Sequence, residues 1–155
     1  MIEIKIVNQY TRIKEQLQSV TLEKGIIMIT GSDQNWNTYM LFMVLGLLRE
    51  IKGGVLEGMP ALVDAETDSY ITPWMKKVDP AVVVSGQIVY GGDLRDEEKL
   101  KNALTVADRC LVIAIAHVNS AEGARIRFKE MGAIPKEEIE EKVKMVITQV
   151  FKETA

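Results

Sequence analysis

The residues most suggestive of chemistry lie in a short stretch that begins at Gly31 and ends at Thr38. These two residues occupy the first and last fixed positions of the phosphate-binding pattern G-x-x-x-x-G-K-[S/T]. Trp36 and Asn37 stand where that pattern has its second glycine and its lysine, and Ser32 lies in the loop before them. The lysine neutralises phosphate charge and the glycine leaves room for the phosphate, so both properties are missing here. We expect a loop that has the length and the terminal residues of a phosphate-binding loop but lacks the glycine and the lysine that bind the phosphate.

Trp36 has two interpretations at this position. It anchors the loop against a neighbouring helix, or it fills the place of the phosphate as a structural plug. An indole buries on the order of 200 Å², which at about 25 cal/mol per Å² gives several kcal/mol as an upper value. A fully exposed Trp36 would instead indicate a contact with a partner protein, because tryptophan is enriched at interface hot spots.

Carboxylates and the only histidine form a second group of candidates. Asp64, Glu66 and Asp68 follow the short apolar run Ala61 to Val63, and His117 directly follows an apolar strand. Ligands of α/β proteins bind where strands end, although an acidic loop is also a common solvated surface. A metal or small ligand held by the acidic residues is therefore one hypothesis. One histidine and no cysteine pair argue against structural zinc, and we expect no metal site.

Three continuous apolar runs are expected to position these residues as buried strands: Ile26 to Thr30, Ala81 to Val84 and Cys110 to Ala116. Apolar residues at helical spacing predict a helix from Asn37 to Ile51. Strands that alternate with helices favour an α/β fold with a mostly parallel central sheet flanked by helices. Further strands are expected at Ile2–Val7, Ala61–Val63 and Met145–Phe151. Further helices are expected at Tyr10–Val20, at Trp74–Val78, after Asp96, from Asn119 to Met131 and from Pro135 to Lys144. A turn is expected at Gly58-Met59-Pro60, and either one bulged strand or a hairpin over Ala81–Tyr90.

Length, charge and composition narrow the function classes. A chain of 155 residues fits one domain, 1–155, and its net charge of −3 argues against nucleic-acid binding. Cys110 is the only cysteine and lies in an apolar run, so an inert core thiol is expected. No apolar stretch is long enough to span a bilayer and no signal sequence is visible, which predicts a cytoplasmic protein without direct membrane insertion.

The order of several short motifs resembles the type II secretion and type IV pilus ATPases. That family has a D-P-D-V strand, then G-E-I-R-D-x-E-T, an A-L helix, T-L-H-T-N-S-A, and a V-I-S-Q strand. The matching motifs span roughly residues 17 to 149, and in order they are Asp79-Pro80 before a valine run, Gly92-Asp93-Leu94-Arg95-Asp96, Ala103-Leu104 with Ala107, Ala114 to Ala121, Met131-Gly132 and Val146 to Gln149.

The resemblance implies a RecA-like P-loop core, which in active relatives hydrolyses ATP within a hexameric ring. By position, Gly31 to Thr38 would be Walker A, Asp64 to Asp68 the acidic box, and His117 the histidine box. The Walker B glutamate corresponds to Gln87 if the valine run sets the register, or to Asp93 if the following glycine and arginine do. The resemblance thus gives Asp93, Gln87, His117 and Asp64 as catalytic candidates, and Gly31, Ser32, Trp36, Asn37 and Thr38 as the degenerate nucleotide-binding residues.

The departures from the family pattern decide the expected function. Neither glutamine nor a shorter aspartate reproduces the catalytic glutamate, and Walker A lacks its lysine. We expect a non-catalytic structural or regulatory relative that binds a protein partner or itself and has impaired nucleotide binding. The alternative is a weakly active ATPase of pilus or secretion assembly, which would use ATP and Mg²⁺.

Overall fold

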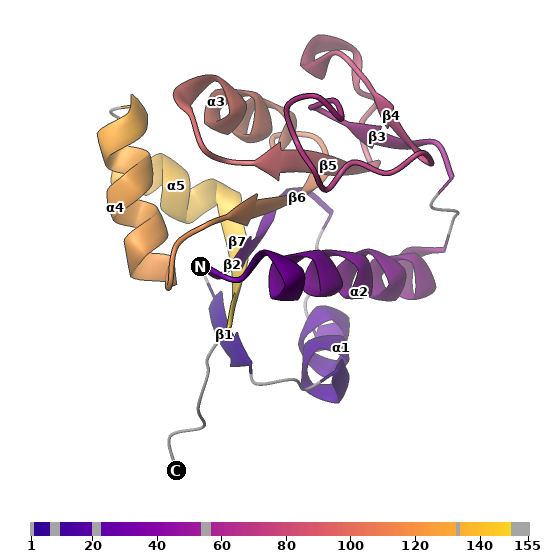
Figure 1. The fold of residues 1–155 in the computed structure, drawn as a ribbon, viewed down its shortest axis with the longest axis horizontal. Coiled ribbons are helices and arrows are strands. Elements are labelled where there is room, and N and C mark those ends of the chain that lie inside the picture. Colours follow the sequence, from indigo (N-terminus) through magenta and orange to yellow (C-terminus); the bar gives the residue numbers. More distant parts are fainter. Residues whose placement is uncertain (1, 7–9, 20–22, 54–56, 133, 150–155) are drawn as a thin grey trace.

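The chain folds around one seven-stranded sheet in which every pairing is parallel (Figure 1). The structure is a computed structural model, and it describes residues 2–6, 10–19, 23–53, 57–132 and 134–149. The strands follow the order β1-β7-β2-β6-β5-β3-β4 across the sheet. Their bounds are β1 Ile2–Ile6, β2 Gly25–Thr30, β3 Met59–Ala61, β4 Met75–Lys77, β5 Ile88–Asp93, β6 Leu111–Ala116 and β7 Val143–Gln149.

Helices cover both faces of this sheet and divide the core into two. One cluster joins α1 (Tyr10–Ser19) and α2 (Gln34–Lys52) to residues such as Ile27 and Ile29 of β2. The other joins α3 (Glu97–Val106), α4 (Ala121–Gly132) and α5 (Lys136–Lys142) to the alternate residues of the same strands. Because both faces are covered, β2 and β6 are buried along their whole length. The predicted α/β fold with a parallel central sheet is confirmed. No helix within the described ranges is long and apolar enough to cross a membrane.

The two central predictions for strands are confirmed. Ile26 to Thr30 lies in β2, and Cys110 to Ala116 contains β6 with the buried thiol directly before it. The predicted helix from Asn37 is also present, although α2 begins three residues earlier, at Gln34. The last predicted strand begins earlier than expected, because β7 starts at Val143 and α5 ends one residue before it. Val7, Val20 and Phe151 lie outside the described residues.

The prediction that Ala81 to Val84 is a buried strand is wrong. Asp79 accepts a hydrogen bond from the Ala81 amide at 2.8 Å and begins a single 3₁₀ turn, Pro80–Val82. The Arg109 side chain then binds the carbonyls of Pro80 and Val83, which holds the segment outside the sheet. Strand β5 starts only at Ile88, so residues 81–90 form neither one bulged strand nor a hairpin.

Two further local predictions are wrong. The segment expected as a helix at Trp74 to Val78 is the edge strand β4, which pairs with β3 through Met59 and Met75. Such a short segment gains more from strand pairing than from one uncapped helical turn. Met59 and Pro60, expected as a turn, belong to β3. The helix expected from Asn119 is present as α4 and begins two residues later, at Ala121, where the Ser120 hydroxyl accepts from the Gly123 amide at 3.0 Å.

Candidate functional site

The connection from β2 to α2 is too short to form a cradle. Only residues 31–33 separate the strand from the helix, so Gln34 and Asn35 are already helical. In a phosphate-binding loop, residues at these positions still belong to the loop that wraps the phosphate. Trp36, Asn37 and Thr38 therefore lie inside the first turns of α2.

The N-terminus of α2 is capped by a carboxylate of the chain itself. Asp33 accepts hydrogen bonds from the amides of Asn35 at 2.9 Å and Trp36 at 3.3 Å. Free amides of this kind are the groups that bind a phosphate at a helix N-terminus. Here an anionic side chain already takes them.

Two other helices that begin at the same edge of the sheet, α3 and α4, also have a carboxylate at their N-terminus. Asp96 accepts from the Lys99 amide at 2.9 Å at the start of α3, the helix predicted to follow it. The Glu3 carboxylate accepts from the Ala121 amide at 2.6 Å at the start of α4, and from the Thr148 hydroxyl at 3.0 Å. Three helix N-termini at this edge thus already have a carboxylate partner.

Asn37, at the position of the motif lysine, has a structural contact. Its side chain is fully buried and its Nδ2 donates to the Gly31 carbonyl at 2.8 Å. The Thr38 hydroxyl donates to the Gln34 carbonyl at 2.8 Å, one helical turn back. Both polar side chains of the former motif therefore bind backbone of the same turn.

Trp36 is half-buried and packs against the hydrophobic cluster of α1 and α2, while Ser32 is exposed. The indole therefore anchors the helix, which agrees with the first interpretation of this residue. The turn itself is closed by Asp33 and Asn37, not by Trp36 as the plug interpretation expected.

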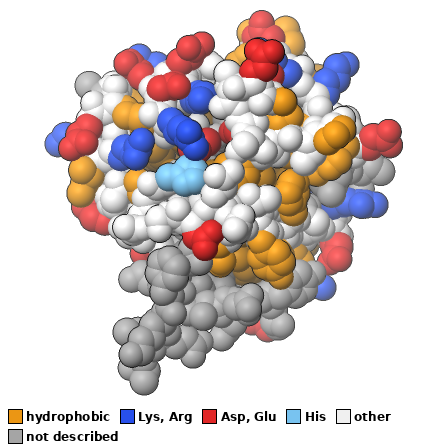
Figure 2. Space-filling view, viewed as in Figure 1, with side chains coloured by type: hydrophobic (Ala, Val, Ile, Leu, Met, Phe, Trp, Pro, Cys, Tyr) orange, Lys and Arg blue, Asp and Glu red, His pale blue; other side chains and the backbone are white. Residues whose placement is uncertain are grey.

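The second group of candidates meets at the carboxyl ends of β5 and β6. Asp93 is the last residue of β5 and His117 follows β6, and their Oδ2 and Nε2 atoms lie 2.9 Å apart. The Arg95 Nε donates to the same Oδ2 at 2.6 Å. The Tyr70 hydroxyl lies 3.3 Å from the His117 Nε2. Figure 2 shows the imidazole in pale blue at the surface, with a basic side chain beside it.

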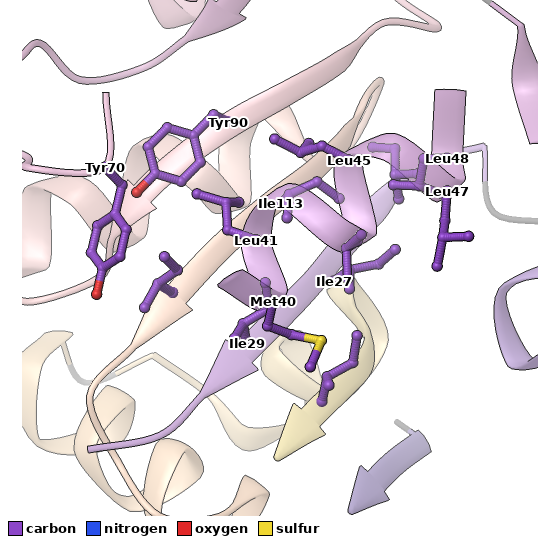
Figure 3. Packing of buried hydrophobic residues seen from close by; sticks show 14 of the residues in the cluster. Ile27, Ile29, Met40, Leu41, Leu45, Leu47, Leu48, Tyr70, Tyr90 and Ile113 are labelled. Carbon is purple, nitrogen blue, oxygen red and sulfur yellow. The ribbon is translucent and has the colours of Figure 1, made fainter. Parts of the chain in front are cut away.

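Asp68 ties this cluster to the acidic loop. Its Oδ1 accepts from the Tyr70 amide at 2.8 Å, and its Oδ2 accepts from the Asp93 amide at 2.7 Å and the Tyr90 hydroxyl at 3.0 Å. Figure 3 shows the rings of Tyr70 and Tyr90 next to each other at the end of the apolar cluster. The buried Asp68 carboxylate accepts three hydrogen bonds, so its hydrogen-bonding capacity is well used and it fixes the positions of Tyr70, Tyr90 and Asp93.

An irregularity in β5 aims Asp93 at these partners. The pairing with β6 shifts between Tyr90 and Gly92, which is a β-bulge. Gly92 has φ +93°, and a Cβ atom there would lie 2.9 Å from Val63. Only glycine fits this conformation and this space without displacing the neighbouring chain.

Burial dominates the electrostatics of the cluster. It raises the pKa of Asp93, while the hydrogen bond from Arg95 and the charge of His117 act in the opposite direction. Burial, with the Asp93 charge second, raises the pKa of Tyr70 to about 12. Burial and the Asp68 carboxylate raise the pKa of Tyr90 well above its usual range. Both tyrosine hydroxyls are therefore protonated at neutral pH.

The remaining candidates lie apart from this cluster or have structural roles. Gln87 precedes β5 and so lies at the opposite end of that strand from Asp93, which separates it from the acidic loop. Asp64 accepts from the Lys77 ammonium at 3.1 Å and from the amides of Glu66 and Thr67. These contacts, Lys77 first, lower the pKa of Asp64. Its carboxylate organises the loop.

Sequence reasoning did not single out Tyr70, Tyr90 or the link from Asp68 to β5. Tyr70 follows Asp68 by two residues, and this spacing was a usable signal because an aspartate often accepts from the amide two residues on. Tyr90 carried no such signal, since a buried tyrosine in a strand usually packs as a core residue.

A nucleotide with Mg²⁺ does not fit the residues of the α2 turn. Asp33 would repel the phosphate and competes for its amides, and the Thr38 hydroxyl that would meet the ion points at the helix backbone. Within the described part of the chain no group of three or more His, Cys, Asp or Glu residues is arranged to hold a metal ion.

Comparisons with known proteins agree with the fold. No protein-family model matches the chain, and no curated protein does. Among solved structures, the chain is similar to the ATPase DotB of Yersinia pseudotuberculosis, with a TM-score of 0.55 and 13% sequence identity. The match covers 85% of this chain and 40% of the DotB chain, so this chain spans less than half of that protein. The fold is therefore an α/β fold of the RecA-like P-loop kind, similar to that of a known ATPase.

Proposed function

We propose that the chain is a non-catalytic relative of the secretion and type IV pilus ATPases, acting in the cytoplasm as a structural or regulatory module. It recognises a protein partner or a second copy of itself and does not depend on a bound nucleotide. One observation carries the proposal: the Asp33 carboxylate takes the amides at the start of α2, where a phosphate would bind.

The free-energy terms that oppose nucleotide binding support the proposal that the chain functions without a nucleotide. A charge-assisted hydrogen bond contributes about 1.5 to 3 kcal/mol, so the missing lysine alone weakens binding by roughly ten-fold to a hundred-fold. A phosphate must in addition displace Asp33 from two amides while both groups carry negative charge. Asn37 adds no compensating charge and is fully buried against Gly31.

The alternative is a weak ATPase, and one observation favours it. Asp93 and His117 remain together at the end of β5 and β6, at the position where the family resemblance places its Walker B and histidine boxes. The Asp93 Oδ2 is already bound by Arg95 and His117, which leaves only Oδ1 to orient a water. This alternative requires the α2 turn to open first.

An equilibrium titration with ATP at millimolar Mg²⁺ separates the two functions. We expect no saturable binding at micromolar ATP, and the same result for Thr38→Ala, because the Thr38 hydroxyl is bound to the helix backbone. A micromolar dissociation constant that Thr38→Ala abolishes would overturn the proposal. Sedimentation velocity of the same sample gives the oligomeric state and so tests self-association independently.

A further inference from the structure

A small cavity lies beside the buried carboxylates and is bordered by the acidic loop. It has a volume of about 210 Å³ and is lined by residues 65–70 together with Asp93 and Arg95. Since water occupies about 30 Å³ per molecule, this is room for several waters or for one small planar group. The α2 turn and its cap do not line this cavity, so it is distinct from the former phosphate site.

The charges around the cavity select a cation. Its lining residues include three carboxylates, those of Glu66, Asp68 and Asp93, and one guanidinium, that of Arg95. Asp68 and Asp93 are 5% and 2% exposed, so their charges are poorly screened by water. An anion would meet like charges there at low dielectric.

An unsatisfied acceptor points to the same conclusion. Among the residues that the structure describes, the Asp93 Oδ1 is buried and has no hydrogen-bond partner, and Asp93 lines the cavity. Buried polar atoms are nearly always paired, so this unpaired acceptor calls for a ligand that donates hydrogen bonds.

Arg95 shows which donor the site accepts. Its Nε binds the Asp93 Oδ2 at 2.6 Å, yet its side chain is 59% exposed. The arginine therefore reaches the buried carboxylate from the solvent side. Because most of the Arg95 side chain is already in solvent, it can leave the carboxylate without disturbing the core.

We propose that this cavity binds a guanidinium group, supplied by a small free ligand or by an arginine side chain of a protein partner, in place of Arg95. A guanidinium presents five donors in one plane and pairs with a carboxylate through two parallel bonds, which would bring a donor to the Asp93 Oδ1. Arg95 is then an internal competitor that covers the carboxylate when no ligand is present. The proposal extends the proposed function by naming the chemistry of a partner.

The direct test is a titration of the wild type and Arg95→Ala with methylguanidinium chloride, followed by NMR at the His117 imidazole and the Tyr70 ring. We expect saturable shifts in Arg95→Ala, with binding at least about ten-fold tighter than in the wild type. Removal of a tethered competitor has this effect, because its effective concentration is in the millimolar range. Methylammonium should bind more weakly, because it lacks the planar pair of donors.

Two variants show whether the carboxylates form the site. In the Arg95→Ala background, Asp93→Asn should weaken methylguanidinium binding about ten-fold or more, the usual effect of removing a charged acceptor. Glu66→Gln, at an exposed rim position that cannot disturb the core, should weaken it about two-fold. Lys101→Ala, which removes an exposed lysine paired with Glu97 on α3, is the control and should change nothing.

The sources of the guanidinium are distinguished by a blocked peptide, acetyl-Gly-Arg-Gly-amide. Binding at least as tight as that of methylguanidinium supports an arginine of a partner protein, whereas binding of methylguanidinium alone supports a small free ligand. Absence of saturable binding by both probes in Arg95→Ala would overturn the proposal, as would equal affinity in Asp93→Asn with the far-UV spectrum unchanged. The ATP titration is independent of these outcomes, so failure of one proposal leaves the other standing.

Discussion

The turn at the start of α2 and the cluster around Asp93 lie at the same edge of one sheet, and their polar groups are satisfied in opposite ways. In the α2 turn, Asp33, Asn37 and Thr38 all bind nearby backbone of the chain itself. In the cluster, residues from three different segments are joined through charged side chains, and the Asp93 Oδ1 stays unpaired.

This difference separates a structural site from one that can still bind. The α2 turn gains stability from its own contacts, and because Asp33 already binds two of its amides and Thr38 binds the helix backbone, these donors are not free for a phosphate. A buried carboxylate with an unpaired oxygen costs stability, and such costs are characteristic of functional sites. The candidate binding site of this chain is therefore the cluster at Asp93 and not the turn at the start of α2.

The largest effect is expected from introducing the glycine and lysine of the phosphate-binding pattern, with Trp36→Gly and Asn37→Lys together. The change should lower the free energy of unfolding by about 3 to 5 kcal/mol, because it buries an ammonium and places glycine in a helix. Urea denaturation measures the loss. The matched control, Asn35→Lys with Tyr39→Gly, changes exposed positions of the same helix and should cost about 1 kcal/mol. Equal losses in both double variants would show that the α2 turn is not a closed structural unit.

Asp68→Asn should have the next largest effect, a loss of about 2 to 3 kcal/mol. Both carboxylate oxygens accept from backbone amides, of Tyr70 and of Asp93, so one amide must face the new NH₂ group. Glu66→Gln, in the same loop and exposed, should change the stability little. If thermal melts of the two variants coincide, Asp68 does not hold the cluster together.

The fold could be predicted from the sequence where burial is continuous. β2 and β6 are buried on both faces, and their uninterrupted apolar runs carry that information directly. The run at Ala81 to Val84 has the same composition, yet Val82 and Val84 are 70% and 66% exposed. The deciding contacts come from Arg109, which is distant in sequence, so local composition could not reveal them.

The candidate site was predictable only in part. His117 could be chosen by its place after an apolar strand, and Asp93 only from the order of the family motifs, which left Gln87 as an alternative. The strand bounds place Gln87 and Asp93 at opposite ends of β5, with Asp93 beside His117. The cap at Asp33 required the true start of α2, three residues before the expected one. Hydrogen bonds between Asp68 and β5 depend on a bulge at Gly92, which no periodicity signals.

A smaller effect tests the cap of α2 against a matched cap. Asp33→Ala should lower the stability by about 1 kcal/mol, the usual value for an N-cap. Asp96→Ala removes an equivalent cap from α3 and should cost a similar amount. Chemical denaturation of both variants measures this. A gain in stability for Asp33→Ala alone would contradict a purely structural role, because it would mean that the carboxylate is held against repulsion.

The smallest expected effect is a difference in the direction of the pH dependence between two carboxylates, that of the buried Asp93 and that of the loop residue Asp64. Burial raises the folded-state pKa of Asp93 above its ordinary value of 3.8, whereas contacts with Lys77 and Thr67 lower that of Asp64. A raised pKa means that the contribution of Asp93 is fully present below pH 3.8 and is lost as the pH rises through its folded-state pKa. For Asp64 the contribution is present above its ordinary pKa and is lost as the pH falls through the lowered value.

We therefore expect the stability of the wild type relative to Asp93→Asn to fall as the pH rises above 4, and its stability relative to Asp64→Asn to fall as the pH drops towards 3. Urea unfolding of the three proteins between pH 3 and pH 8 measures both differences. If the two differences in unfolding free energy changed with pH in the same direction, Arg95 and His117 would offset the burial of Asp93 completely. That result would contradict the view that the Asp93 carboxylate costs stability whereas the Asp64 carboxylate stabilises its loop.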